Sequence, residues 1–124
     1  MSYSIYQYWE GPKPTYIEIC HEIIDITNHG NVKRLGIDDV DVGVNLDFLG
    51  IQQKVDVIRL YLLYNFGGMW MDSDCICPHD LSTVFELLNR YDFIASTEIP
   101  GIGEHITPNS FLVSTPKNKI ITEI

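Results

Sequence analysis

The 124-residue sequence has few basic residues and no long apolar segment, and each absence excludes a class of function. Only eight lysines and arginines stand against 17 aspartates and glutamates, for a net charge of −9 at pH 7. Proteins that bind nucleic acid need clustered basic side chains, and Lys33-Arg34 is the only adjacent pair, so a nucleic-acid partner is excluded. The longest uncharged apolar stretch near the middle, residues 60–71, is shorter than the about 20 residues that cross a bilayer.

Cysteine is also scarce, and no secretory signal is visible at the start of the sequence. Cys20, Cys75 and Cys77 are an odd number of cysteines, so we expect free thiols and a location in the reducing cytoplasm. A zinc site at Cys75, Cys77 and His79 lacks the usual spacing and an evident fourth ligand, which favours buried thiols beside a surface histidine. The remaining histidines are likewise expected at the surface: His21, His29 and His105.

Short β-prone segments alternate with helical patterns along the chain. Strands are expected at residues 3–9, 31–37, 68–71, 92–97 and 110–115, and helices at 15–29, 51–65, 80–90 and from 116 onward. This alternation predicts one α/β domain over residues 1–124, a layered sandwich with a mostly parallel sheet. The last helical pattern stops at Ile124 without a cap, so we expect a fold lacking its C-terminal half. Its isoleucines would then be unusually exposed: Ile120, Ile121 and Ile124.

Two helices show apolar periodicity, and one of them also carries an internal charged pair. Within residues 15–29 the apolar face is expected to consist of Ile19, Ile23 and Ile26, with Cys20 and Ile24 beside it. Within residues 51–65 the stripe consists of Ile51, Val55, Ile58 and Leu62. Asp56 and Arg59 are three residues apart and share a face of this second helix. On a helix packed against a sheet, such charges must be neutralised or used in binding, whereas Lys54 is expected to face solvent.

Two aspartates directly follow the short strand at residues 68–71. On extended backbone, Trp70, Asp72 and Asp74 project to one side, with the Cα atoms of the two aspartates about 6.6 Å apart. Both carboxylates could then approach one Mg²⁺-like ion, at the strand end where open α/β sheets bind ligands. A hydrated strand end is the alternative. The same spacing in Asp39-Val40-Asp41 has no apolar strand before it, and that pair is expected to be solvated surface.

The segment "KVDVIRLYLLYNFGGMWMDSD", residues 54–74, resembles the core motif of the DXD-containing sugar-transferase superfamily, and of its capsular-polysaccharide-synthesis branch in particular. The opening "IYQYWEGPKP" and the trailing "ITPNSFLVSTPKNKII" are similar to other parts of that branch. The resemblance implies a glycosyltransferase-A (GT-A) fold, a Rossmann-like sandwich that binds a nucleotide-sugar. It also implies Mn²⁺ or Mg²⁺, a UDP- or GDP-sugar donor, a glycan or lipid-linked acceptor, and transfer with retention of anomeric configuration.

The resemblance further implies roles for the matching residues. Trp9 would line the base pocket, with a core tryptophan as the alternative. Asp56 and Arg59 would approach the sugar and diphosphate of the donor. Asp72 would contact ribose or sugar, and Asp74 would bind the metal that bridges the diphosphate. The implied catalytic residues are therefore Asp72, Asp74 and Arg59.

Three further positions match with less detail. Gly67 and Gly68 would permit a tight turn and a close approach of the backbone to the donor, with a plain helix cap as the alternative. Asn109 matches a polar position near the site.

Other functions remain open from the sequence alone. A phosphohydrolase of the haloacid-dehalogenase type also places D-x-D after a strand, but it needs Thr or Val where this chain has Ile76. A non-catalytic remnant that binds the donor, as an oligomer or with a partner chain, is the third alternative. The resemblance also implies that family members are longer than this chain, with an additional part that supplies acceptor contacts.

Overall fold

The computed structural model describes residues 3–96 and 110–123, and a mixed five-stranded sheet lies at its centre. The strands are β1 (Ile5–Tyr8), β2 (Val32–Leu35), β3 (Gly68–Met71), β4 (Phe93–Ala95) and β5 (Phe111–Ser114). Their order is β2-β1-β3-β5-β4, with β1 parallel to both β2 and β3 and β5 antiparallel to both β3 and β4. The predicted α/β class is confirmed. The sheet is mixed because β5 runs against the other four strands.

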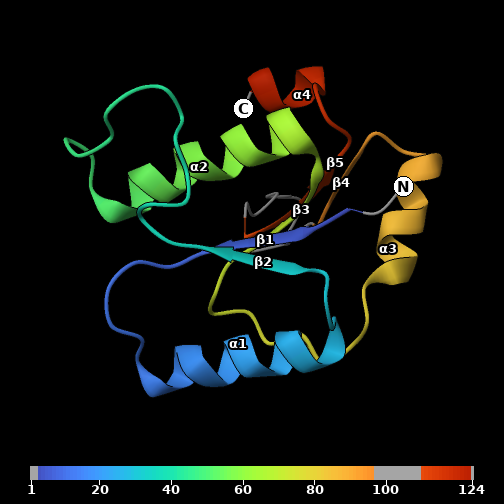
Figure 1. Cartoon of the computed structure of the whole chain (residues 1–124). Coiled ribbons are helices and arrows are strands. Elements are labelled where there is room, and N and C mark those ends of the chain that lie inside the picture. Colours follow the sequence, from blue (N-terminus) through green and yellow to red (C-terminus); the bar gives the residue numbers. More distant parts are fainter. Residues whose placement is uncertain (1–2, 97–109, 124) are drawn as a thin grey trace, which may run out of the picture.

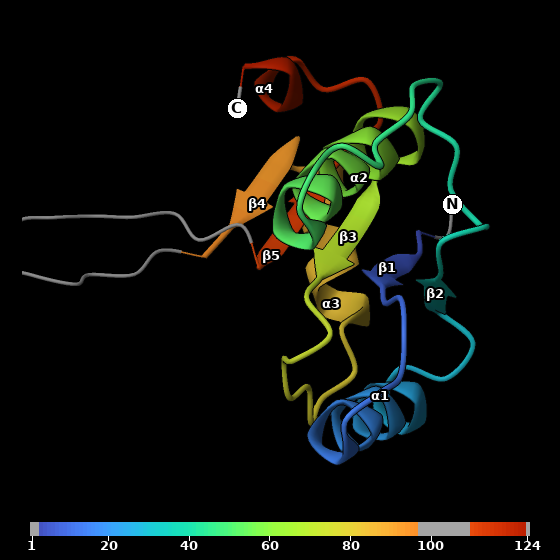
Figure 2. The same cartoon turned by 90° about the vertical axis from the view of Figure 1, so that its left-hand side faces the viewer.

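Helices cover both faces of this sheet. They are α1 (Thr15–Thr27), α2 (Ile51–Phe66), α3 (Ser82–Glu86, followed by a 3₁₀ turn at Leu87–Asn89) and α4 (Lys119–Thr122). Figure 1 shows α1 below the sheet and α2 with α4 above it, and the turned view in Figure 2 keeps this separation. None of the helices in residues 3–96 and 110–123 is long and apolar enough to cross a membrane.

Strand β3 divides its side chains between the two faces as its alternation predicts. Trp70 packs with the α2 residues Ile58 and Leu62, whereas Met69 and Met71 pack in the cluster of the opposite face, which contains α1. The expected helix at 80–90 is shorter than predicted, because a five-residue α-helix gives way to a 3₁₀ turn. The weak helix formers Thr83 and Val84 lie in that short helix.

Helix α1 buries Cys20 and Ile24, as predicted, but it does not bury Ile19 and Ile26. The buried side chains are Ile17, Cys20, His21 and Ile24. Ile19 and Ile26 are 50% and 71% exposed, and His21, predicted at the surface, is only 4% exposed. Tertiary packing selects this face because α1 carries apolar residues on two sides, and the sheet covers only one of them.

The C-terminal helix also differs from its prediction. Ile121 is buried in the hydrophobic cluster that contains residues of α2, whereas Ile120 is exposed. Ile124 lies outside the described residues, as does His105. The prediction that all of these isoleucines are unusually exposed is therefore wrong for Ile121, because α4 packs against α2.

The turn from α2 into β3 depends on two glycines with positive φ. Gly67 has φ +67° and Gly68 has φ +106°. A Cβ atom at Gly68 would lie 2.6 Å from the carbonyl oxygen of Ser4, and one at Gly67 would lie 2.7 Å from Cδ of Pro116. These glycines let the start of β3 approach neighbouring segments of the chain closely.

Candidate active site

A cavity of about 630 Å³ opens at the carboxyl ends of β1 and β3. Its walls come from the chain just after β1, the first half of α2, and the end of β3 with the turn that follows. Because β1 and β3 are parallel, their carboxyl ends meet at this edge, where open α/β sheets bind ligands. Five residues singled out from the sequence line this one cavity: Trp9, Asp56, Arg59, Asp72 and Asp74.

Arg59 is the buried centre of the charged groups in the cavity. Its side chain lies over the Trp70 ring, 5.2 Å from the centroid, and the residue is 4% exposed. One terminal nitrogen donates to Asp56 Oδ1 at 2.7 Å and the other to Asp72 Oδ1 at 3.1 Å. Its Nε is buried and has no hydrogen-bond partner within residues 3–96 and 110–123. The guanidinium therefore has charged partners from both α2 and the end of β3.

The two aspartates lie in a turn and not on continued strand. Strand β3 ends at Met71, and the amide of Cys75 donates to the Asp72 carbonyl at 3.2 Å. Asp72 Oδ1 also accepts from Trp70 Nε1 at 2.7 Å, whereas the exposed Asp74 side chain makes no hydrogen bond to any described residue. The predicted extended spacing of the two carboxylates is thus replaced by a turn, but both still line the cavity.

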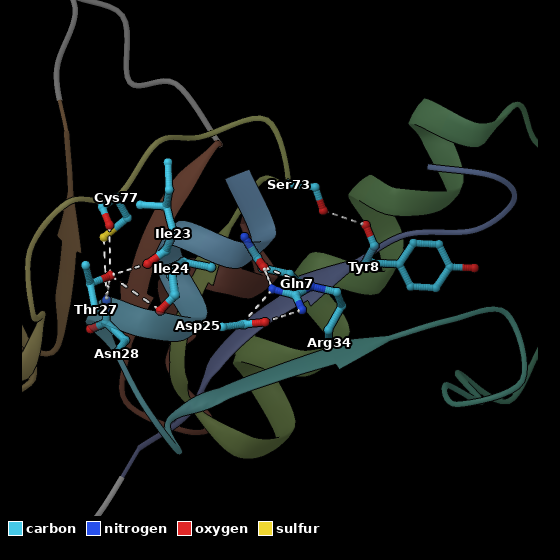
Figure 3. A network of polar contacts seen from close by, with 10 residues as sticks. All are labelled: Gln7, Tyr8, Ile23, Ile24, Asp25, Thr27, Asn28, Arg34, Ser73 and Cys77. Carbon is cyan, nitrogen blue, oxygen red and sulfur yellow. Dashed lines mark hydrogen bonds and ion pairs between the residues drawn. The ribbon is translucent and has the colours of Figure 1, made fainter. Parts of the chain in front are cut away.

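Buried and partly buried hydrogen bonds tether this turn and the segment after it to the rest of the fold (Figure 3). The Ser73 hydroxyl donates to the Tyr8 carbonyl at 3.2 Å, which joins the turn to the end of β1. Beyond the turn, the Thr27 hydroxyl donates to the Cys77 carbonyl at 2.8 Å. The buried Asn28 side chain donates to the His79 carbonyl at 3.0 Å and accepts from the Leu81 amide at 2.8 Å. The aspartate turn is therefore bonded to the end of β1, and the segment that follows it is bonded to the end of α1.

Several cavity residues carried no sequence signal, and Glu10 is the main one. Glu10 Oε2 accepts from the Tyr8 hydroxyl at 2.5 Å and from Lys54 Nζ at 2.9 Å. These hydrogen bonds, the one from Tyr8 first, lower the pKa of Glu10, and burial raises the pKa of Tyr8. The Lys54 side chain is 13% exposed, so the prediction that it faces solvent is wrong. Sequence spacing could not reveal this pair, because its members are 44 residues apart.

The cavity is acidic overall. Four carboxylates line it, from Glu10, Asp56, Asp72 and Asp74, against the single guanidinium of Arg59, for a formal charge of −3. A ligand that carries a diphosphate would be repelled by this lining unless a cation compensated the charge. The lining therefore suits a cation, or an anion that arrives together with one.

The carboxylates of the cavity fit a metal ion whose coordination is completed by the phosphates of a bound ligand. Within residues 3–96 and 110–123, no three His, Cys, Asp or Glu side chains lie close enough together to hold an ion by themselves. Mg²⁺ is commonly bound through one or two carboxylates, with waters and substrate phosphates completing its coordination. Asp74 makes no hydrogen bond to a described residue, and Asp72 keeps one oxygen outside its bonds to Arg59 and Trp70. Cys75 and Cys77 are free thiols, as predicted.

Two predicted positions, Gly67 and Gly68, do not line the cavity. Gly67 and Gly68 lie at the start of β3, about 13 Å of strand before Asp72, and their close approach is to Ser4 and Pro116. Asn109 lies outside the described residues. The acidic pair at residues 39–41 is exposed, as predicted for solvated surface.

Comparison with known families adds one match. The model of a family described as capsular polysaccharide synthesis protein matches residues 15–124. The matched segment contains α2, β3 and the aspartate turn, and it begins after Trp9 and Glu10. A comparison with curated proteins found no match.

Proposed function

The chain belongs to the capsular polysaccharide synthesis protein family, and from this membership we propose that it is a metal-dependent glycosyltransferase. It would transfer a sugar from a UDP- or GDP-sugar to a glycan or lipid-linked acceptor, with retention of anomeric configuration, on a GT-A fold. Membership supports a role in polysaccharide synthesis. The donor, the metal and the transfer itself are our proposal.

One observation carries the proposal: Arg59, Asp72 and Asp74 line a single cavity at the carboxyl ends of parallel strands. Breaking the bond between the sugar and the diphosphate leaves negative charge on the departing diphosphate. A fixed guanidinium beside that group stabilises the charge as it develops. Arg59 is suited to this because Asp56, Asp72 and the Trp70 ring hold it in place before a ligand binds.

Each lining residue then has a distinct task. Asp74, exposed and without a described partner, would bind Mn²⁺ or Mg²⁺, and Asp72 would orient Arg59 and contact ribose or sugar. When bound there, the ion would supply the positive charge that compensates the diphosphate, which the acidic lining lacks. Trp9 would offer an aromatic face to the nucleobase. In the transfer, the electron pair of the broken bond would stay with the departing diphosphate oxygen. The acceptor hydroxyl would form the new bond to the sugar and pass its proton to that oxygen.

Calorimetric titration with UDP and GDP, with Mn²⁺ and with EDTA, tests the proposal. We expect binding only with the metal, and we expect Asp74→Asn to abolish it because the ligand carboxylate is lost. Asp41→Asn is the matched control, since Asp41 is an exposed member of the other acid-x-acid pair and its hydrogen bond from Gly43 survives in asparagine. Binding that persists in EDTA, or in Asp74→Asn, would contradict the proposed site.

A turnover assay distinguishes a glycosyltransferase from a protein that only binds the donor. A glycosyltransferase should slowly release sugar from a UDP- or GDP-sugar in the presence of Mn²⁺, and Arg59→Lys should slow that release because lysine cannot hold both aspartates with one planar group. Metal-dependent binding without any release would instead favour the non-catalytic alternative.

A further inference from the structure

Glu10 is held at the cavity by two side chains that approach one of its oxygens. Both the Tyr8 hydroxyl and Lys54 Nζ donate to Oε2, and no described residue donates to Oε1. Lys54 does not line the large cavity but a smaller one of about 190 Å³, while Tyr8 lines both. Lys54 therefore reaches Glu10 from outside the large cavity, and Oε1 accepts from no described residue.

The charge at this position restricts which part of a ligand can lie there. Glu10 is ionised at neutral pH, because its two donors lower the pKa of the carboxyl group. A phosphate would be repelled by that carboxylate, whereas the cation proposed at Asp74 and the Arg59 guanidinium would together attract one. A neutral hydrogen-bond donor, such as a hydroxyl group, suits Glu10 best.

Glu10 directly follows Trp9, the aromatic residue that is proposed to stack on the nucleobase. Trp9 and Glu10 are consecutive and line the same cavity, and the Trp9 indole nitrogen donates to the Pro12 carbonyl at 3.3 Å, which restrains the ring. A nucleoside whose base lies on Trp9 has its ribose next to the base. The guanine edge presents two parallel donors and would need both carboxylate oxygens, but Oε2 already accepts twice.

We propose that Glu10 selects ribonucleotides by accepting a hydrogen bond from a ribose hydroxyl, with Tyr8 and Lys54 as positioning residues. This inference rests on the proposed function, because it assumes a nucleoside diphosphate in the cavity. It adds a residue outside the D-x-D motif and predicts which chemical group of the donor that residue recognises.

The test compares UDP and GDP with their 2′-deoxy and 3′-deoxy forms, by calorimetry with Mn²⁺. The wild-type protein should bind the ribonucleotide about tenfold more tightly than one of the deoxy forms, as expected for a hydrogen bond to a charged group. Glu10→Ala should bind both forms equally and still require Mn²⁺. Tyr8→Phe and Lys54→Met should each reduce the preference without removing it, because Glu10 remains but is less restrained.

Controls separate selection from damage to the fold. Glu18→Ala removes an exposed glutamate from α1 and should keep the full preference. Glu10→Met keeps most of the side-chain volume and has no oxygen acceptor, so it is the second variant if alanine disturbs folding, and circular dichroism checks both. An unchanged preference in the Glu10 variants, or none in the wild type, overturns this inference while leaving metal-dependent binding intact. If no nucleotide binds the wild type at all, the proposed function fails as well.

Discussion

Acidification should destabilise the protein through His21. This side chain is buried on α1, and neither ring nitrogen has a hydrogen-bond partner within residues 3–96 and 110–123. Burial, with smaller contributions from Arg34 and Lys13, lowers the pKa of His21 from 6.5 to about 4, and Asp25 opposes this only in part. Protonation of the ring is therefore much easier in the unfolded chain than in the fold.

The size and sign of the effect follow from proton linkage. At pH 7.5 and above, the ring is almost entirely neutral in both states and contributes almost no pH dependence. As the pH falls, the unfolded chain takes up the proton first, so the free energy of unfolding decreases by about 2 kcal/mol at pH 5 and about 3 kcal/mol at pH 4. The loss levels off only below the folded pKa.

Urea unfolding of the wild type and of His21→Leu between pH 7.5 and 4 measures this effect. Leucine removes the titrating group and no hydrogen bond that the described structure makes. The stability of the wild type relative to the variant should therefore fall by about 3 kcal/mol across the range, while other titrating groups cancel in the difference. His29→Gln, at an exposed position just beyond α1, should retain the pH dependence of the wild type. Parallel stability curves for the wild type and His21→Leu would refute the reasoning.

Two further predictions concern the fold itself. Gly68→Ala should lower the free energy of unfolding by about 2 kcal/mol or more, because φ is +106° and the new Cβ would lie 2.6 Å from the Ser4 carbonyl oxygen. Gly43→Ala shares the positive φ but meets nothing within 4 Å, so urea unfolding should show a smaller loss; equal losses would contradict the steric argument. On α1, Ile24→Ala should cost about 2–5 kcal/mol and Ile26→Ala about 0.5 kcal/mol or less, since only Ile24 is buried. Thermal or urea unfolding that ranks the two in the reverse order would mean that α1 packs through its other face.

Sequence patterns predicted the features that depend only on residues close together in the chain. The alternation around Trp70 and the three-residue spacing of Asp56 and Arg59 are properties of one strand and one helix, and both are present in the structure. The buried face of α1 could not be chosen in the same way, because apolar residues occur on two sides of that helix. Which side packs depends on where the sheet lies.

Contacts between distant segments were beyond the reach of sequence patterns. The pairing of Glu10 with Lys54 and the antiparallel direction of β5 both depend on how elements far apart in the chain come together. The aspartate turn was predictable from the sequence in one respect and not in another. Its place at the edge of the sheet was predictable from the strand before it, whereas its turn geometry depends on hydrogen bonds from Ser73 and from the end of α1.

The tethers of that turn have a thermodynamic consequence. Ser73 anchors it to β1, and Thr27 and Asn28 anchor the segment that follows, all without any ligand. The backbone that carries both carboxylates is thus pre-organised, and association loses little conformational entropy there. Only the exposed Asp74 side chain still has to select a rotamer. A ligand that reaches this edge of the sheet therefore meets a largely rigid backbone. Its binding enthalpy should reflect the contacts that form and not the ordering of a loop.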